Sequence, residues 1–151
     1  MTLESASYLA KAPEDLSDAR QIVGIGLAGV AARSACYAAF HAAEALIVEK
    51  TGRVAKSHSG VRSEFARLAK DDPRTGKAMT AFLAQGYKYK EIGDYGVGAD
   101  AIVTMSDAQA AIRSASDFLA HIEALLACGL GCANRAAPEC GASWGLDLAG
   151  S

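Results

Sequence analysis

Four side chains that could bind a ligand or transfer protons are Arg33, Tyr37, His41 and Glu44. They follow one another at spacings of four, four and three, which places them on one side of an alanine-rich helix. Arginine, tyrosine and histidine on a shared face can bind phosphate and move protons. The alternative is that the tyrosine and the histidine are satisfied inside an interface between helices or between subunits.

A second candidate is the pair Arg53 and His58, which are five residues apart. In a metal-independent ribonuclease, a histidine can take the proton from a 2′-hydroxyl while an arginine holds the phosphate. An arginine and a histidine at this spacing also occur often by chance. The alternative is a polar loop in which His58 helps to cap the helix that follows.

The third candidate is the stretch 87–96, which has three tyrosines and two lysines within ten residues. Cations combined with aromatic stacking faces are typical of a surface that binds single-stranded RNA or a nucleotide. Lys90 and Asp94 are four residues apart, so a simple ion pair at a helix end is equally compatible with the sequence.

Residues 24–29, GIGLAG, match the glycine pattern G-x-G-x-x-G of dinucleotide-binding folds. That chemistry needs a strand before the glycines and a helix after them, so that the pyrophosphate meets free backbone N–H groups. Only Ile22 and Val23 precede the glycines as apolar residues, and the stretch before them has a helical pattern. We therefore interpret residues 24–29 as a turn between two helices.

Helices must position these residues, because the 151-residue chain has 33 alanines and only 7% aromatic residues. Alanine is the best helix former and a poor strand former, so the composition predicts an all-α domain. The expected helices open near residue 3, with a restart or a kink at Pro13, and continue over 27–50, 59–70, 74–92 and from a capping box of Ser106 and Gln109 onward.

Two segments are expected to lie outside the helices. Residues 93–98 are expected to form a tight polar loop. The helical spacing of apolar residues stops after residue 128. This predicts a helical domain over 1–128 and a poorly ordered glycine-rich tail over 129–151. In the last helix, apolar residues at spacings of three and four predict a stripe facing the core: Ile112, Ala115, Leu119, Ile122 and Leu126.

Composition also excludes several classes of protein. The formal net charge of −2 excludes a strongly basic nucleic-acid scaffold, so any contact with RNA must come from a local patch. The longest apolar run is too short to span a bilayer, and no secretory signal opens the chain, so we expect a cytoplasmic protein. The cysteines are expected to be free thiols, and we predict no metal and no cofactor. They are Cys36, Cys128, Cys132 and Cys140.

Several stretches together resemble one family. Residues 32–46, ARSACYAAFHAAEAL, are similar to a helix of small HEPN-domain proteins, and SHSGV at 57–61, followed by Phe65, is similar to the connector of that family. KEIGDYG at 90–96 resembles its R-x-x-A-D-Y-G segment, and residues 8–20 fit its first helix. The resemblance extends in order from about residue 3 to residue 126.

The resemblance implies an up-and-down bundle of four to five helices that commonly dimerises. HEPN proteins include metal-independent endoribonucleases, often toxins that are paired with a minimal nucleotidyltransferase antitoxin, while other members bind nucleotides or serve as helical scaffolds. The ribonuclease motif of the family, R-x4–6-H, lies about where this chain has Lys90 to Tyr95. Lysine cannot form the bidentate phosphate contact of arginine, and an ionised Asp94 would repel the scissile phosphate.

From these patterns and the resemblance we predict a nucleotide- or RNA-binding protein of a toxin–antitoxin or defence pair. If the protein is an enzyme, we expect a metal-independent endoribonuclease. The expected catalytic residues are His58, Lys90 and Asp94, and the expected binding residues are Arg33, Tyr37, Lys88 and Tyr95. A composite site requires the bend at 57–60 and the segment 94–95 to become neighbours. The expected partners are a second copy of the chain, a nucleotidyltransferase, and RNA or nucleotide, with no membrane. The alternative is a non-catalytic interaction module without a positively charged pocket.

Overall fold

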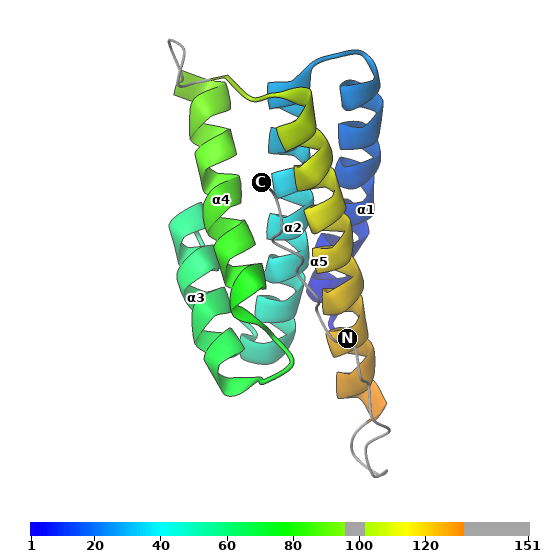
Figure 1. The fold of residues 1–151 in the computed structure, drawn as a ribbon. Helices are drawn as coiled ribbons and strands as arrows, with labels where there is room; N and C mark the ends of the chain where they lie inside the picture. The colour runs from blue at the N-terminus through cyan, green and yellow to red at the C-terminus, as the bar shows by residue number, and fades with distance from the viewer. Residues whose placement is uncertain (96–101, 132–151) are drawn as a thin grey trace.

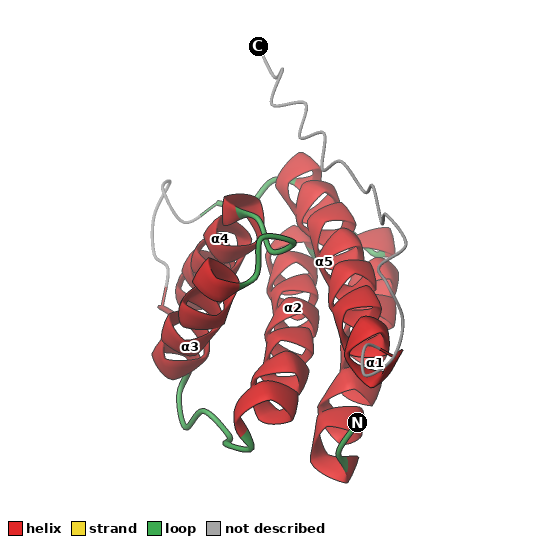
Figure 2. Cartoon of the chain, turned by 90° about the horizontal axis from the view of Figure 1, so that it is seen from below, coloured by secondary structure: helices red, strands yellow, loops and turns green. Residues whose placement is uncertain are grey.

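The helical prediction can be compared with the computed structural model, which describes the backbone of residues 1–95 and 102–131 and the side chains of 1–92 and 102–129. These ranges form helices and no strand, so an all-α bundle is confirmed (Figures 1 and 2). The helices are α1 (Leu3–Gly24), α2 (Ala28–Thr51), α3 (His58–Asp71), α4 (Lys77–Tyr95) and α5 (Met105–Gly131).

The first helix begins at a side-chain cap and ends at a glycine turn. Thr2 accepts a hydrogen bond from the backbone N–H of Ser5, and α1 then continues through Pro13 as one helix. After α1 the chain reverses at Gly26, whose φ of 84° lies in the left-handed region that glycine adopts without strain. The glycine-rich stretch 24–29 is therefore a turn between two helices, as predicted.

The centre of the bundle is α2, which packs against each of the other helices. Eight of its alanines are buried, and their small side chains allow α1 and α5 to approach it closely. Gly52 follows with a φ of 66° and ends the helix in the left-handed conformation. The predicted helix over 27–50 is thus confirmed within one residue at each end.

The connector after α2 sets the direction of α3. His58, the first residue of α3, packs against Phe40 in the middle of α2, while Asp72 at the far end of α3 lies near Lys50 at the end of α2. The connector therefore runs back along α2, and α3 then follows α2 in the same direction (Figure 1). Strict up-and-down alternation is interrupted at this one helix.

Two details of the later helices differ from the predictions. Residues 93–95 belong to α4 and not to the predicted loop over 93–98, because a single glycine inside a helix costs only about 1 kcal/mol. Residues 96–98 lie outside the described residues. The last helix is capped by Thr104 and Asp107, each accepting a hydrogen bond from the other's backbone N–H, and not by Ser106 and Gln109. It reaches Gly131, and the rest of the predicted tail lies outside the described residues.

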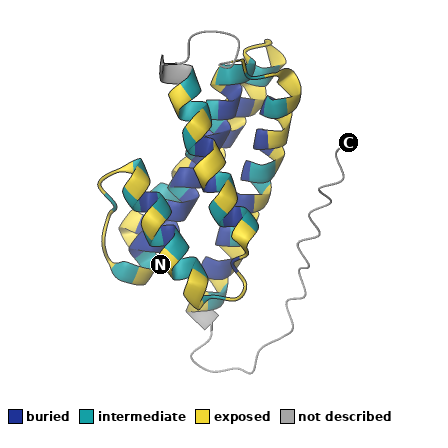
Figure 3. Ribbon diagram, turned by 60° about the vertical axis from the view of Figure 1, so that its left-hand side comes forward, coloured by how far each residue is buried: buried dark blue, intermediate teal, exposed yellow. Residues whose placement is uncertain are grey.

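The apolar stripe predicted for α5 is confirmed, since all five of its members are buried. The buried residues lie on the sides of the helices that face one another (Figure 3). Aromatic contacts join α3 and α4 to α5. Phe65 of α3 packs on Phe118 of α5 with their ring centroids 5.4 Å apart, and Phe82 of α4 packs on the same ring. These contacts hold the pair α3 and α4 against the rest of the bundle.

Candidate functional site

A pocket of about 180 Å³ lies where α2, the connector and the start of α3 meet. It brings together residues from the first two sequence candidates, because the connector returns His58 to the middle of α2. Its lining consists of Tyr37, Phe40, His41, Glu44, Ala55, Lys56, Ser57, His58 and Val61.

His58 is the first residue of α3, and aromatic neighbours hold its ring in place. It does not cap the helix. Ser57 is the N-cap, and its hydroxyl accepts from the backbone N–H of Gly60. The His58 ring meets Phe40 and Tyr37 edge to face, at centroid distances of 4.6 and 5.8 Å. Its Nδ1 is buried and has no hydrogen-bond partner among the described residues.

Burial is the main cause that lowers the pKa of His58 below its ordinary value, and positive charge on Lys90 and on His41 adds to the effect. Because the lowered pKa favours the uncharged ring near neutral pH, this imidazole is suited to accept a proton. The same interaction indicates that Lys90 of α4 lies near His58. The predicted approach of 57–60 to 94–95 stays a prediction, because the side chains of 94–95 lie outside the described residues.

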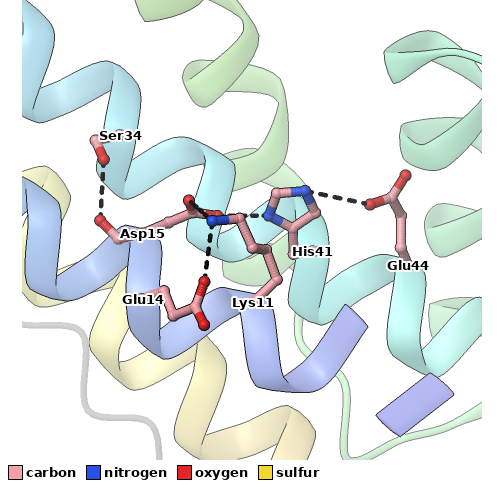
Figure 4. A network of polar contacts seen from close by, with 6 residues as sticks. All are labelled: Lys11, Glu14, Asp15, Ser34, His41 and Glu44. Carbon is pink, nitrogen blue, oxygen red and sulfur yellow. Dashed lines mark hydrogen bonds and ion pairs between the residues drawn. The ribbon is translucent and has the colours of Figure 1, made fainter. Parts of the chain in front are cut away.

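His41 faces the pocket from the opposite side, where it is held by an aspartate that no sequence pattern indicated. Its Nδ1 lies 2.5 Å from Oδ2 of Asp15 in α1, and its Nε2 lies 4.0 Å from Oε2 of Glu44 (Figure 4). The rings of Tyr8 and Tyr37 are each nearly parallel to the His41 ring, at 6.4 Å.

The pKa values of two ionisable side chains near His41, Glu44 and Tyr8, are shifted by their surroundings. Burial raises the pKa of Glu44, and the positive charge of His41 opposes that shift in part. Burial, followed by the negative charges of Glu44 and Glu4, raises the pKa of Tyr8. The lining of the pocket thus has a mixed charge, with the carboxyl group of Glu44, the two histidines and Lys56 of the connector.

The structure separates some of the other predicted residues from this pocket. Lys88 is exposed and lies two residues from Lys90 on α4, which turns it to the other side of the helix by about 200°. Arg33 is half-buried and does not belong to the described lining of the pocket, and neither does the exposed Arg53. The side chains of Asp94 and Tyr95 lie outside the described residues. The site assignment as a whole therefore stays a prediction.

Asp15 is the residue that sequence reasoning missed. Its residue exposure is only 9%, and its backbone oxygen accepts a hydrogen bond from the hydroxyl of Ser34 on α2. A carboxylate at this position follows no motif, because its partner His41 lies 26 residues further along the chain on another helix. A single acidic residue within an otherwise buried helix face was the available signal.

The comparison with protein families agrees with the helical fold. Residues 5–125 match the model of the HEPN domain, and the chain belongs to this family. Membership relates it to nucleotide- and RNA-related functions in general, and HEPN domains often dimerise. A comparison with curated proteins finds no match. None of the helices in the described ranges is both long and apolar enough to cross a membrane.

Proposed function

We propose that this HEPN protein binds an RNA phosphate in the pocket between α2 and α3 and cleaves RNA there without a metal ion. The observation that carries the proposal is His58, which lines the pocket and whose pKa is lowered by burial and by the nearby positive charge of Lys90, so that its uncharged ring can accept a proton. The volume of about 180 Å³ is smaller than that of pockets that enclose a whole ligand. It is suited to one phosphodiester group and the adjoining part of the ribose.

In the proposed reaction, uncharged His58 takes the proton from the 2′-hydroxyl of the RNA. The 2′-oxygen then bonds to phosphorus, the bond from phosphorus to the 5′-oxygen breaks, and that oxygen receives a proton. The products are a 2′,3′-cyclic phosphate and a 5′-hydroxyl end. Lys90 stabilises the negative charge that develops on the phosphoryl oxygens. As a point charge, lysine does this without the bidentate geometry of arginine.

The test is incubation of purified protein with labelled single-stranded RNA in the presence of EDTA. We expect cleavage with 2′,3′-cyclic phosphate ends, and we expect His58→Ala to slow it on the order of 10²-fold or more, because a general base is lost. Cleavage that survives in a double variant, His58→Ala with Lys90→Ala, would contradict the site assignment.

Two lysines on α4 provide a matched pair for the binding step. Lys90→Met is expected to weaken RNA binding and to reduce its dependence on salt concentration, because one phosphate contact is removed. Lys88→Met removes the same charge from the outer side of the same helix, and it is expected to change binding much less. Equal effects of the two variants would indicate attraction to overall charge and not to the pocket.

The proposed biological setting is a toxin–antitoxin or defence pair, in which the chain forms a homodimer and acts with a minimal nucleotidyltransferase. Support for this setting comes from the resemblance of residues 32–46, 57–61 and 90–96 to the HEPN proteins of such pairs. Measurement of the mass in solution tests the homodimer. Co-expression with a nucleotidyltransferase encoded beside the chain, followed by purification, tests the partner.

A second candidate function, a non-catalytic interaction module, is favoured by exposed apolar side chains at one end of the bundle. Ile25, Leu27 and Val30 are exposed at the turn between α1 and α2, and Ile102 and Met105 are exposed at the start of α5, which lies at the same end (Figure 1). Exposed apolar patches often mark protein-binding surfaces. Replacing Ile25 and Leu27 with serine would abolish partner binding under this function and leave RNA cleavage unchanged under the first.

A further inference from the structure

The proposed cleavage needs a proton donor for the leaving 5′-oxygen, and the residues discussed so far do not supply one. We propose that His41 is this general acid and that Asp15 is the positioning residue that holds it, so that the two histidines of the pocket divide the proton transfers between them. This inference rests on the proposed function and assigns the second half of the same reaction.

The contact between Asp15 and His41 fixes which ring nitrogen is available. With Oδ2 of Asp15 only 2.5 Å from Nδ1 of His41, the Nδ1 position carries a proton that it donates to the carboxylate. Asp15 is itself fixed, because it lies in the middle of α1 and its backbone oxygen accepts from Ser34. The ring is therefore tied to both α1 and α2.

The other ring nitrogen of His41, Nε2, is the one that can donate a proton to the substrate. Nε2 of His41 is 4.0 Å from Oε2 of Glu44, which is too long for a hydrogen bond. His41 also lines the pocket and its side chain is 25% exposed. The contact drawn between His41 and Glu44 in Figure 4 is this long ion pair. A substrate oxygen at the pocket can therefore accept a proton from Nε2 without displacing a hydrogen bond.

The charges around the two histidines assign them different roles. His41 lies against the carboxyl groups of Asp15 and Glu44, so a proton donor at this ring has negatively charged groups beside it. His58 instead faces aromatic rings and the cation of Lys90. A positive charge on His41 lowers the pKa of His58, so a charged donor and an uncharged acceptor stabilise each other across one pocket.

The proton balance of the step is complete. The 2′-hydroxyl gives its proton to His58, and the imidazolium of His41 gives the Nε2 proton to the leaving 5′-oxygen as the bond to phosphorus breaks. Exchange with water restores both rings. The other ionisable groups around His41 are Tyr8 and Lys11 on α1 and Tyr37 on α2. Lys11 reaches the second oxygen of Asp15 at 3.5 Å, and so it does not replace His41 at Oδ2.

Two substrates distinguish a proton donor from a merely structural residue. The leaving alcohol of RNA, or of the dinucleotide uridylyl-adenosine, needs a proton, whereas the 4-nitrophenolate of uridine 3′-(4-nitrophenyl phosphate) leaves without one. We expect Asp15→Asn and His41→Gln to slow cleavage of the dinucleotide on the order of 10²-fold, the size of a lost general acid. The same variants are expected to retain nearly full activity on the nitrophenyl substrate.

The controls use neighbouring residues. Glu14→Gln removes an exposed carboxylate beside Asp15 that contacts Lys11 and not His41, and it should leave both activities unchanged. His58→Ala should lose both activities, because both substrates need the general base. Loss of the Asp15 carboxylate should also move the alkaline limb of the pH–rate profile for the dinucleotide to lower pH, a change that loss of packing does not produce.

Each outcome has a defined meaning. Equal losses on both substrates in folded Asp15→Asn, or no loss on either, would overturn the role of the dyad while leaving RNA cleavage by His58 intact. A wild-type protein that cleaves neither substrate overturns the proposed function and the dyad with it. If Asp15→Asn does not fold, nitrogen NMR of the wild-type ring decides the matter, because an unprotonated Nδ1 in His41 contradicts the arrangement.

Discussion

The two sides of the pocket belong to parts of the bundle that are held together differently. The side of His41 belongs to α1 and α2, which share the most extensive helix interface of the described residues and pack through buried alanines. The side of His58 belongs to α3 and α4, which contact α5 at few positions and pack on α2 less extensively than α1 does. Large side chains contribute to their attachment, among which Phe65 and Met79 are buried.

This difference separates the two halves of the proposed chemistry. Many small contacts and the Asp15 carboxylate fix His41, so a single substitution far from the site should move it little. The position of His58 depends on the less extensive packing of α3 and α4 on α2 and on the aromatic contacts with Phe118. Disturbing these helices should therefore affect the proton acceptor before it affects the proton donor.

The largest effect is expected for Phe65→Ala, which removes the ring that joins α3 to α5. Phe65 is fully buried and lies 5.4 Å from the ring of Phe118. Removing a buried phenylalanine costs about 3–5 kcal/mol of unfolding free energy, because a cavity remains. Denaturant unfolding measures this loss. A cost below about 1 kcal/mol would show that α3 is held by other contacts.

A smaller effect is expected at Gly86, where α4 comes closest to α2. A Cβ at this position would lie 3.0 Å from both Cβ and Sγ of the buried Cys36, so Gly86→Ala should push the two helices apart. We expect a loss of about 1–3 kcal/mol in unfolding free energy, the usual cost of overpacking, and reduced RNA cleavage as Lys90 moves away from His58.

Gly29 near the start of α2 is the matched control for this substitution. A Cβ at Gly29 would meet nothing within 4 Å, and alanine is the better helix former. Gly29→Ala should therefore raise the unfolding free energy by about 0.5–1 kcal/mol. Thermal melting compares the two variants, and a stabilising Gly86→Ala would mean that α4 is free to adjust against α2.

The smallest effect is expected for Glu44→Gln and should depend on pH. Burial raises the pKa of Glu44 in the folded protein, so the folded state favours the protonated acid and loses stability as the pH rises through the raised value. The glutamine variant should therefore be more stable than the wild type at neutral pH, and the difference should vanish below the ordinary carboxyl pKa. A difference that is constant with pH would contradict this.

His58 should act in the opposite direction. Because its pKa is lowered in the folded protein, the stability that the uncharged ring contributes is present above its ordinary pKa of 6.5 and is lost as the pH falls through the lowered value. Unfolding curves of His58→Gln, recorded between pH 7 and pH 5, should show a weaker decline than those of the wild type.

Local sequence determined the helices of this protein. The alanine content, the apolar stripe in α5 and the glycines at 24–29 and 52 are local signals, and they predicted the helices and most of their ends. Prediction was wrong at two element ends. Gly93 lies within α4, since one glycine inside a helix costs only about 1 kcal/mol. The cap of α5 is the local pair Thr104 and Asp107, a second capping pattern that stands just before the predicted one at Ser106.

The pocket was determined by tertiary structure. Sequence patterns identified Tyr37, His41, His58 and Lys90 as separate candidates, but no spacing relates them to Asp15, because that contact joins two helices. The return of the connector along α2 places His58 opposite His41, and the close packing of α1 on α2 brings Asp15 to the His41 ring. Contacts between helices depend on how whole surfaces pack, and that information is absent from any single stretch of sequence.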